Sequence, residues 1–136
     1  MSNPPVVIDT CSFYNREFMR WIRTYRGDRE IPPVVYCELA LSAIHKSGDT
    51  SALDGLLYGA GIAVSDMLME HGRRAAELAR GDPKWKERWR DYLIAAHAAY
   101  APYRVVTENI KDFACLGARA IRPSDFKYGI LDGTIR

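Results

Sequence analysis

PVVID, residues 5–9, sets three β-branched apolar residues directly before a carboxylate. A continuous apolar run of this length is typical of a strand that is buried on both faces, as in parallel sheets. Asp9 would end this strand and open a polar cluster with Thr10, Cys11 and Ser12. Since ligands of such sheets bind at the carboxyl ends of the strands, we expect chemistry at this position.

The rest of the chain alternates between helix and strand patterns. We expect further strands over 61–65, 104–107 and 120–122, and helices over 13–25, 35–46, 51–58, 66–80, 82–100 and 110–116. Ser12, Asp66 and Asp82 are the expected helix caps, and two prolines make 31–34 extended. The alternation predicts an α/β fold, a three-layer α/β/α sandwich with a mostly parallel central sheet.

The composition is that of an ordinary globular protein. The chain has 136 residues, 48% of them hydrophobic and 26% charged, and its net charge is +2. We therefore expect a single domain over 1–136, with the tail from about 129 loosely held. Its three cysteines lack C-x-x-C spacing, which argues against a zinc ribbon or disulfide framework and favours a reduced, cytoplasmic setting. Without a signal peptide or a bilayer-spanning apolar run, a soluble protein is expected.

Three acidic residues stand in apolar surroundings. Asp9 ends the first expected strand, Glu38 interrupts the apolar stretch 34–41, and Asp91 opens the largely apolar helix segment 91–99. The first two have ordinary explanations, Asp9 as a helix cap and Glu38 on a surface stripe. Ala95 and Ala98 share the helix face of Asp91 and let it approach the sheet, so that its carboxylate is either buried at a cost or faces a cation.

Carboxylates that converge repel one another and raise one another's pKa. A divalent cation removes this conflict, and Mg²⁺ prefers a few carboxylates together with water and substrate oxygens. If the three acids cluster, the sequence predicts a metal-assisted reaction at phosphate.

An ordered set of motifs spans nearly the whole chain. It comprises VVIDTC (6–11), EL (38–39), DYLIAA (91–96), VTENIKDF (106–113) and IRPSDF (121–126). This set resembles that of PIN domains, above all the toxin nucleases of VapBC-type modules. The resemblance implies a PIN-like fold and hydrolysis of RNA phosphodiester bonds, with Mg²⁺ or Mn²⁺ as the cofactor.

The resemblance also implies roles for single residues. The implied catalytic set is Asp9, Glu38, Asp91, Thr107, Asn109 and Asp112, and the implied metal ligands are Asp9, Glu38, Asp91 and Asp112. Whether Asn109 or Asp112 completes the site stays open, because members of the family vary at this position. Asp112 also fits a role in capping or supporting its short helix. Thr107 would orient Asp9 or a water by hydrogen bonding. The sequence departs from the family at Cys11, where Ser or Asn is common, and at Tyr36, where a smaller hydroxyl residue is common.

The implied biological role is that of an endoribonuclease toxin. The resemblance implies a homodimer and a cognate antitoxin whose tail blocks the acidic groove. One alternative is a PIN-type nuclease of RNA maturation or decay that has no antitoxin. Another is a catalytically silent PIN module that binds RNA or protein.

Basic and aromatic residues near the acids could hold RNA. The basic residues are Arg16, Arg20, Arg23, Arg26, Arg29, Lys84, Lys86, Arg88 and Arg90, and the aromatic residues are Tyr14, Trp21, Trp85 and Trp89. Arginine and lysine would pair with phosphates, and aromatic rings would stack on bases. A solvated helix face for the basic residues, and core packing for the tryptophans, explain the same pattern. The three histidines have no zinc-protease spacing, and we expect surface or packing roles for them.

Overall fold

The computed structural model describes residues 3–99, 103–116 and 118–126. Its centre is a five-stranded parallel sheet in the order β3-β2-β1-β4-β5. The strands are β1 (Val6–Ile8), β2 (Arg29–Ile31), β3 (Ile62–Val64), β4 (Arg104–Val106) and β5 (Ala120–Ile121). All three residues of β1 are buried, as its unbroken apolar sequence predicted.

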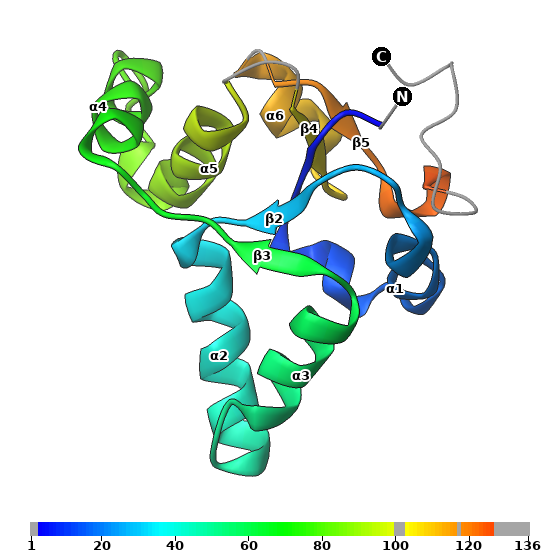
Figure 1. Cartoon of the computed structure of the whole chain (residues 1–136). Coiled ribbons are helices and arrows are strands. Elements are labelled where there is room, and N and C mark those ends of the chain that lie inside the picture. The colour runs from blue at the N-terminus through cyan, green and yellow to red at the C-terminus, as the bar shows by residue number, and fades with distance from the viewer. Residues whose placement is uncertain (1–2, 100–102, 117, 127–136) are drawn as a thin grey trace.

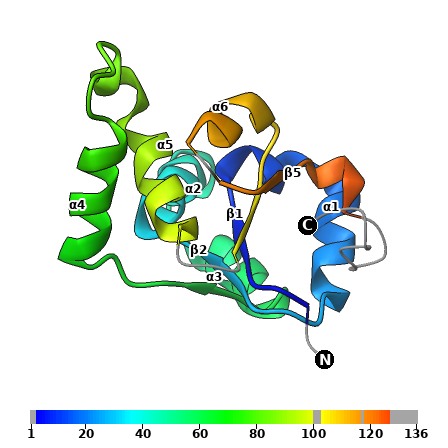
Figure 2. The same ribbon diagram turned by 90° about the horizontal axis from the view of Figure 1, so that it is seen from above.

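Helices cover both faces of this sheet. The α-helices are α1 (Arg16–Trp21), α2 (Pro33–Ser47), α3 (Ser51–Gly59), α4 (Met69–Leu78), α5 (Trp85–Ala98) and α6 (Ile110–Cys115), and the 3-10 helices are η1 (Thr10–Tyr14), η2 (Ile22–Thr24) and η3 (Pro123–Asp125). Seen from above, α5 and α4 lie on one side of β1 and α1 lies on the other (Figure 2). The predicted three-layer α/β/α sandwich is therefore confirmed.

The main core fills the space between β1, β4 and the helices. Phe18 of α1, Ile94 of α5 and Phe113 of α6 are each fully buried against the strands. A smaller cluster, Ala75, Tyr92 and Ala96, joins α4 to the outer face of α5. This second cluster explains why α4 stands at the edge of the molecule (Figure 1).

Strand β2 was not predicted from the sequence. Only an extended entry over 31–34 was expected, because Arg29 and Glu30 are charged and a buried strand is normally apolar. Both side chains have polar partners: Arg29 Nη1 donates to the Ile22 carbonyl (3.1 Å), and Glu30 Oε1 lies 3.5 Å from His97 Nε2. Side-chain pairing of this kind lets a polar strand lie between β1 and β3.

The expected single helix over 13–25 was wrong: α1 begins only at Arg16 and ends at Trp21, and the 3-10 helix η2 follows it. Ser12 does not cap it, because the Ser12 hydroxyl donates to the Val106 carbonyl (2.9 Å) and joins the loop to β4. Asn15 is the cap of α1, its side chain accepting from the Phe18 backbone N–H (2.9 Å). Asp66 does not cap α4, which begins at Met69. The expected loose tail from about 129 lies outside the described residues.

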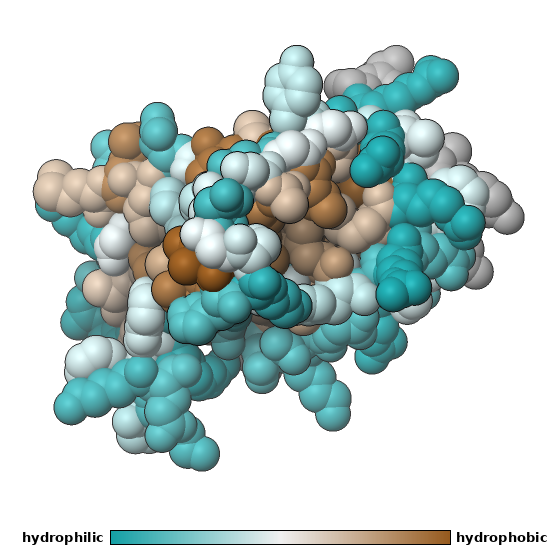
Figure 3. Space-filling model, turned by 90° about the horizontal axis from the view of Figure 1, so that it is seen from below, coloured by the Kyte–Doolittle hydropathy of each residue, from teal (hydrophilic) through white to brown (hydrophobic). Residues whose placement is uncertain are grey.

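Exposed apolar side chains occur on α2 and α3. Leu41 and Ile44 of α2 and Leu56 of α3 are each more than a third exposed. The view from below shows brown apolar atoms lying among teal charged side chains (Figure 3). Among the described residues, no helix combines the length and apolar character that crossing a bilayer requires.

A polar cluster around the buried His97 joins α4 and α5 to β2 and to Ser65, the residue after β3. His97 of α5 is 5% exposed, and its Nε2 lies 2.7 Å from the Ser65 hydroxyl as well as 3.5 Å from Glu30. The His71 ring of α4 stacks on His97 with ring centroids 4.5 Å apart. A hydrogen bond with His97 is the main cause that lowers the pKa of Glu30 below its ordinary value; burial opposes this shift, and a hydrogen bond from Tyr103 adds to it.

Glu30→Gln is expected to weaken the acid dependence of folding. Because the folded state lowers the pKa of Glu30, the carboxylate stabilises the fold above its unfolded pKa near 4.5, and this contribution is lost as pH falls through the lower folded value. Urea unfolding of the wild type between pH 3 and pH 6 should therefore show a larger fall in the free energy of unfolding than the variant shows. Glu87→Gln, on the exposed part of α5, is the control, and an equal slope in wild type and Glu30→Gln would contradict the assignment.

Candidate active site: an acidic cluster around Arg90

Asp9 lies at the carboxyl end of β1 and is 1% exposed. Its backbone N–H continues the sheet by donating to the Val106 carbonyl (2.9 Å), so the carboxylate is fixed beside β4. Oδ1 accepts from the Thr10 backbone N–H (2.8 Å), which makes Asp9 the cap of η1. The two roles weighed for Asp9, helix cap and member of an acidic cluster, occur together.

Thr107, the residue after β4, is fully buried and donates from its hydroxyl to Asp9 Oδ2 (2.8 Å). Cys11 lies on the same oxygen, its Sγ donating at 3.5 Å, and burial is the main cause of the raised pKa of this thiol. A protonated thiol acts here as a weak donor. The family departure at Cys11 thus still provides Asp9 with a hydrogen-bond donor.

Glu38 comes to the same place from the first half of α2. Its Oε1 accepts from the Thr10 hydroxyl (2.8 Å), and the side chain is 37% exposed. Asp91, from α5, is the third carboxylate, with its side chain 17% exposed. Burial is the main cause that raises the pKa of Asp91, Arg90 opposes it, and the charges of Asp9 and Asp112 add to it. The structure therefore brings Asp9, Glu38 and Asp91 together from three elements.

Arg90 stands in the middle of these carboxylates. Its Nε donates to Glu38 Oε1 (2.5 Å), Nη1 donates to Asp91 Oδ1 (2.8 Å), and Nη2 pairs with Asp9 Oδ1. Nη2 also donates to the Thr10 hydroxyl (3.0 Å). Although burial alone lowers the pKa of Arg90, the carboxylates of Asp9 and Glu38 outweigh it and hold the pKa above its ordinary value. The guanidinium is thus the charge partner of all three acids.

Asn109 and Asp112 lie further out. Both are exposed, and they line an open hollow of about 270 Å³ together with Glu108, Ile110, Lys111 and Arg122. The Asn109 backbone N–H donates to the Thr107 hydroxyl (3.0 Å), which connects this loop to Asp9. Asp112 reaches the cluster through its charge, since it contributes to the raised pKa of Asp91.

The acidic residues fit a hard divalent cation in kind. Mg²⁺ binds oxygen ligands at about 2.1 Å, so ligand oxygens of one ion lie within roughly 4 Å of each other. Arg90 instead holds each carboxylate on a different nitrogen of a flat guanidinium. Accordingly, no three His, Cys, Asp or Glu side chains among the described residues are arranged to hold a metal ion. The carboxylates are therefore the right kind of ligand for a divalent cation, but they are spaced in this structure to bind the Arg90 guanidinium.

The central position of Arg90 was not predicted. It was grouped with a basic run before Asp91, as a contact for RNA or part of a solvated face. Neighbours i and i+1 on a helix point in different directions, so Asp91 gave no sign that Arg90 turns toward it. Thr10, which joins Glu38 to Arg90, was also missed, although it directly follows Asp9.

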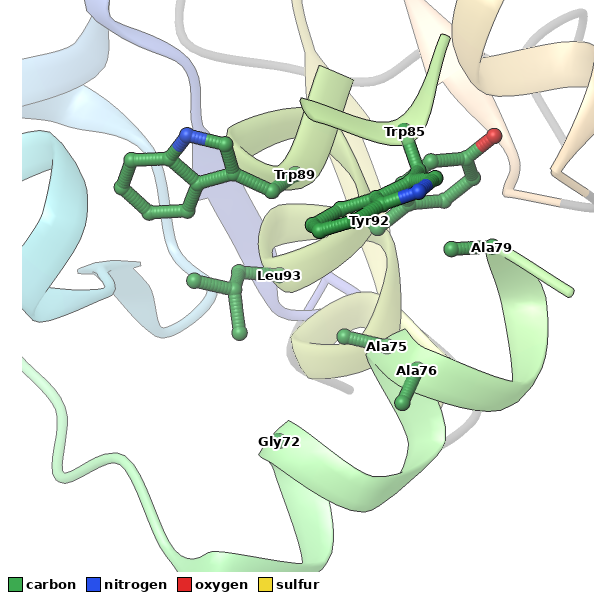
Figure 4. A pocket seen from close by; sticks show the side chains of 8 residues that line it. All are labelled: Gly72, Ala75, Ala76, Ala79, Trp85, Trp89, Tyr92 and Leu93. Carbon is green, nitrogen blue, oxygen red and sulfur yellow. The ribbon is translucent and has the colours of Figure 1, made fainter. Parts of the chain in front are cut away.

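Trp85 and Trp89 of α5 are not core residues. They are 50% and 53% exposed and line an apolar groove of about 260 Å³ between α4 and α5. Figure 4 shows this groove, with Ala75 and Ala76 contributed by α4, Ala79 by the residue that follows α4, and Tyr92 and Leu93 by α5. The core-packing role weighed for these tryptophans is wrong. Trp21, by contrast, packs against the core.

Comparison with known proteins finds a likeness in structure. No family model matches the sequence, and no curated protein sequence matches it. Nine chains of solved structures match. One belongs to a toxin–antitoxin complex from Klebsiella pneumoniae. It superposes with a TM-score of 0.67 over 87% of this chain and 97% of that chain, at 18% sequence identity. At this identity the likeness establishes a shared fold.

Proposed function

We propose that the protein is a divalent-metal-dependent endoribonuclease of the PIN type. The observation that supports this most is the meeting of Asp9, Glu38 and Asp91 at the carboxyl end of β1. These residues belong to three separate motifs of the PIN-like set. If the three motifs form one site, their carboxylates have to converge, as they do here. The shared fold with a chain of a toxin–antitoxin complex adds support from structure.

In this proposal each side chain has a separate task. When bound, Mg²⁺ or Mn²⁺ would supply Lewis-acid chemistry, lowering the pKa of water and stabilising negative charge on phosphate. Asp9, Glu38 and Asp91, with Asp112 or Asn109, would hold the ion. Thr107 fixes the orientation of the Asp9 carboxylate by hydrogen bonding.

The biological role proposed is that of the toxin in a toxin–antitoxin pair. A structural neighbour described as a toxin–antitoxin complex supports this role. The proposal includes a cognate antitoxin as the partner and a homodimer as the assembly. A gene for a small partner directly adjacent would favour the toxin over a nuclease of RNA maturation, and light scattering would measure the mass of the assembly.

The test of the nuclease is cleavage of a mixed RNA pool with Mg²⁺ or Mn²⁺, and again with excess EDTA. Internal cuts that depend on the metal and stop with EDTA would support the proposal. A folded protein that cuts no RNA with either metal would overturn it. Arg90 inside the acidic cluster favours a second candidate in that case, a catalytically silent PIN module that binds RNA.

The double variant Lys111→Gln/Arg122→Gln is expected to weaken RNA binding. Both residues line the hollow beside Asp112, where they would pair with phosphates flanking the cut. The slope of log affinity against log salt should fall by about one for each phosphate-binding charge that is removed. Fluorescence anisotropy with labelled RNA measures this, and Lys46→Gln at the end of α2 is the control. An unchanged salt slope would exclude this hollow from the RNA path.

A further inference from the structure

We propose that Arg90 is an exchangeable counter-ion, whose guanidinium holds the place of the divalent cation and must leave before the metal can load. This inference rests on the proposed function, because it concerns regulation of the same site. It differs from the silent-module hypothesis, in which Arg90 would hold the carboxylates permanently. The charge, the geometry and the burial of the cluster each bear on the choice.

The charges of the cluster are not balanced. One guanidinium contacts Asp9, Glu38 and Asp91, and Asp112 lies near enough to act on Asp91. A single positive charge therefore faces more negative charge than it neutralises. A divalent cation neutralises twice as much, which gives the carboxylates a reason to exchange one cation for the other.

The geometry makes the two cations mutually exclusive. All the nitrogens of the Arg90 guanidinium are used, and each contacts a different carboxylate. A small ion needs these oxygens drawn together around one point. Because Asp9 Oδ1 pairs directly with Nη2, an ion on that oxygen and the guanidinium would compete for the same lone pairs.

The different exposure of Arg90 and Asp9 allows Arg90 to leave, but only when a metal ion takes its place. The Arg90 side chain is 25% exposed, so its head group can reach solvent by rotation of its flexible stem. The Asp9 side chain is 1% exposed and would be left as a buried, unpaired charge if Arg90 left alone. Departure of Arg90 is therefore favourable only when another cation replaces it.

The experiment measures binding of Mn²⁺ alone, without RNA, by the electron paramagnetic resonance signal of the free ion. Arg90→Gln is expected to bind Mn²⁺ roughly tenfold or more tightly than the wild type, because the competing charge is gone. Arg88→Gln is the matched control, since Arg88 lies on the same helix and pairs with Asp82 instead. It should bind Mn²⁺ as the wild type does.

Thermal unfolding provides a second readout. Without metal, Arg90→Gln should melt below the wild type, because the carboxylates repel one another; Mn²⁺ should raise its Tm more than that of the wild type. Arg90→Lys keeps the charge but places it on a single nitrogen, which does not match three acids held on three nitrogens of the guanidinium. Its Mn²⁺ affinity and its Tm should therefore lie between those of the wild type and Arg90→Gln. It also serves if Arg90→Gln does not fold.

The outcomes separate this inference from the proposed function. Tighter Mn²⁺ binding by Arg90→Gln, without RNA cleavage by any form, would support the exchange and overturn the nuclease. Equal Mn²⁺ affinity in wild type and Arg90→Gln, with metal-dependent cleavage intact, would overturn the exchange and keep the nuclease. Failure of both forms to bind Mn²⁺ would overturn the exchange as well.

Discussion

Asp9→Asn is expected to abolish metal-dependent RNA cleavage, lowering kcat/KM by roughly a hundredfold or more. Asp9 is the most deeply buried carboxylate of the cluster, and the Thr10 backbone N–H and the Thr107 hydroxyl hold it in one orientation. Asparagine keeps its size but removes its charge, so the ion would lose its most firmly positioned anionic ligand. Cleavage of an end-labelled RNA in Mn²⁺ measures the loss.

The control for Asp9→Asn is the same change at an exposed site. Asp49 lies in the turn between α2 and α3, where its carboxylate accepts from the Ser51 backbone N–H and where asparagine can do the same. Asp49→Asn should cleave RNA like the wild type. Circular dichroism must show both variants folded. Identical RNA products from wild type and Asp9→Asn would mean that this cluster is not the source of the cleavage.

The sequence was most informative where local pattern and buried environment agree. The run Val6–Ile8 is apolar because β1 is covered on both faces, and Asp9 interrupts it where the sheet ends. Asp91 precedes Ile94 and Ala95, which are buried between α5 and the sheet. In both cases the apolar neighbours fix the direction of the carboxylate, so its position follows from the chain around it.

Features that depend on partners distant in sequence could not be predicted. Strand β2 is charged because His97, more than sixty positions later, pairs with Glu30. Ser12 resembled a helix cap but binds the Val106 carbonyl. Arg90 resembled a surface residue, and only the convergence of α2, α5 and β1 shows that it faces the acids. Long polar side chains choose partners in three dimensions, which periodicity along the chain does not record.

Phe113→Ala is expected to lower the free energy of unfolding by about 3–5 kcal/mol. Phe113 is fully buried in the main core and belongs to α6, a helix of only six residues. A helix this short has little stability of its own and depends on its packed side chain. The Phe113 carbonyl also accepts from the backbone N–H groups of Leu116 (3.1 Å) and Ala118 (3.0 Å), so the packed side chain also holds these two contacts in place. Urea unfolding measures the change.

Two variants show that the effect of Phe113→Ala comes from packing. Lys111→Ala, on the exposed face of the same helix, should change stability by no more than about 0.5 kcal/mol. Phe113→Leu keeps part of the buried volume, so its free energy of unfolding should lie between that of Phe113→Ala and that of the wild type. A wild-type urea midpoint for Phe113→Ala would mean that α6 is held by its backbone alone. Because Asn109 is the N-cap of α6 and Asp112 lies in its first turn, that result would also mean that the position of these two residues does not depend on the packing of Phe113.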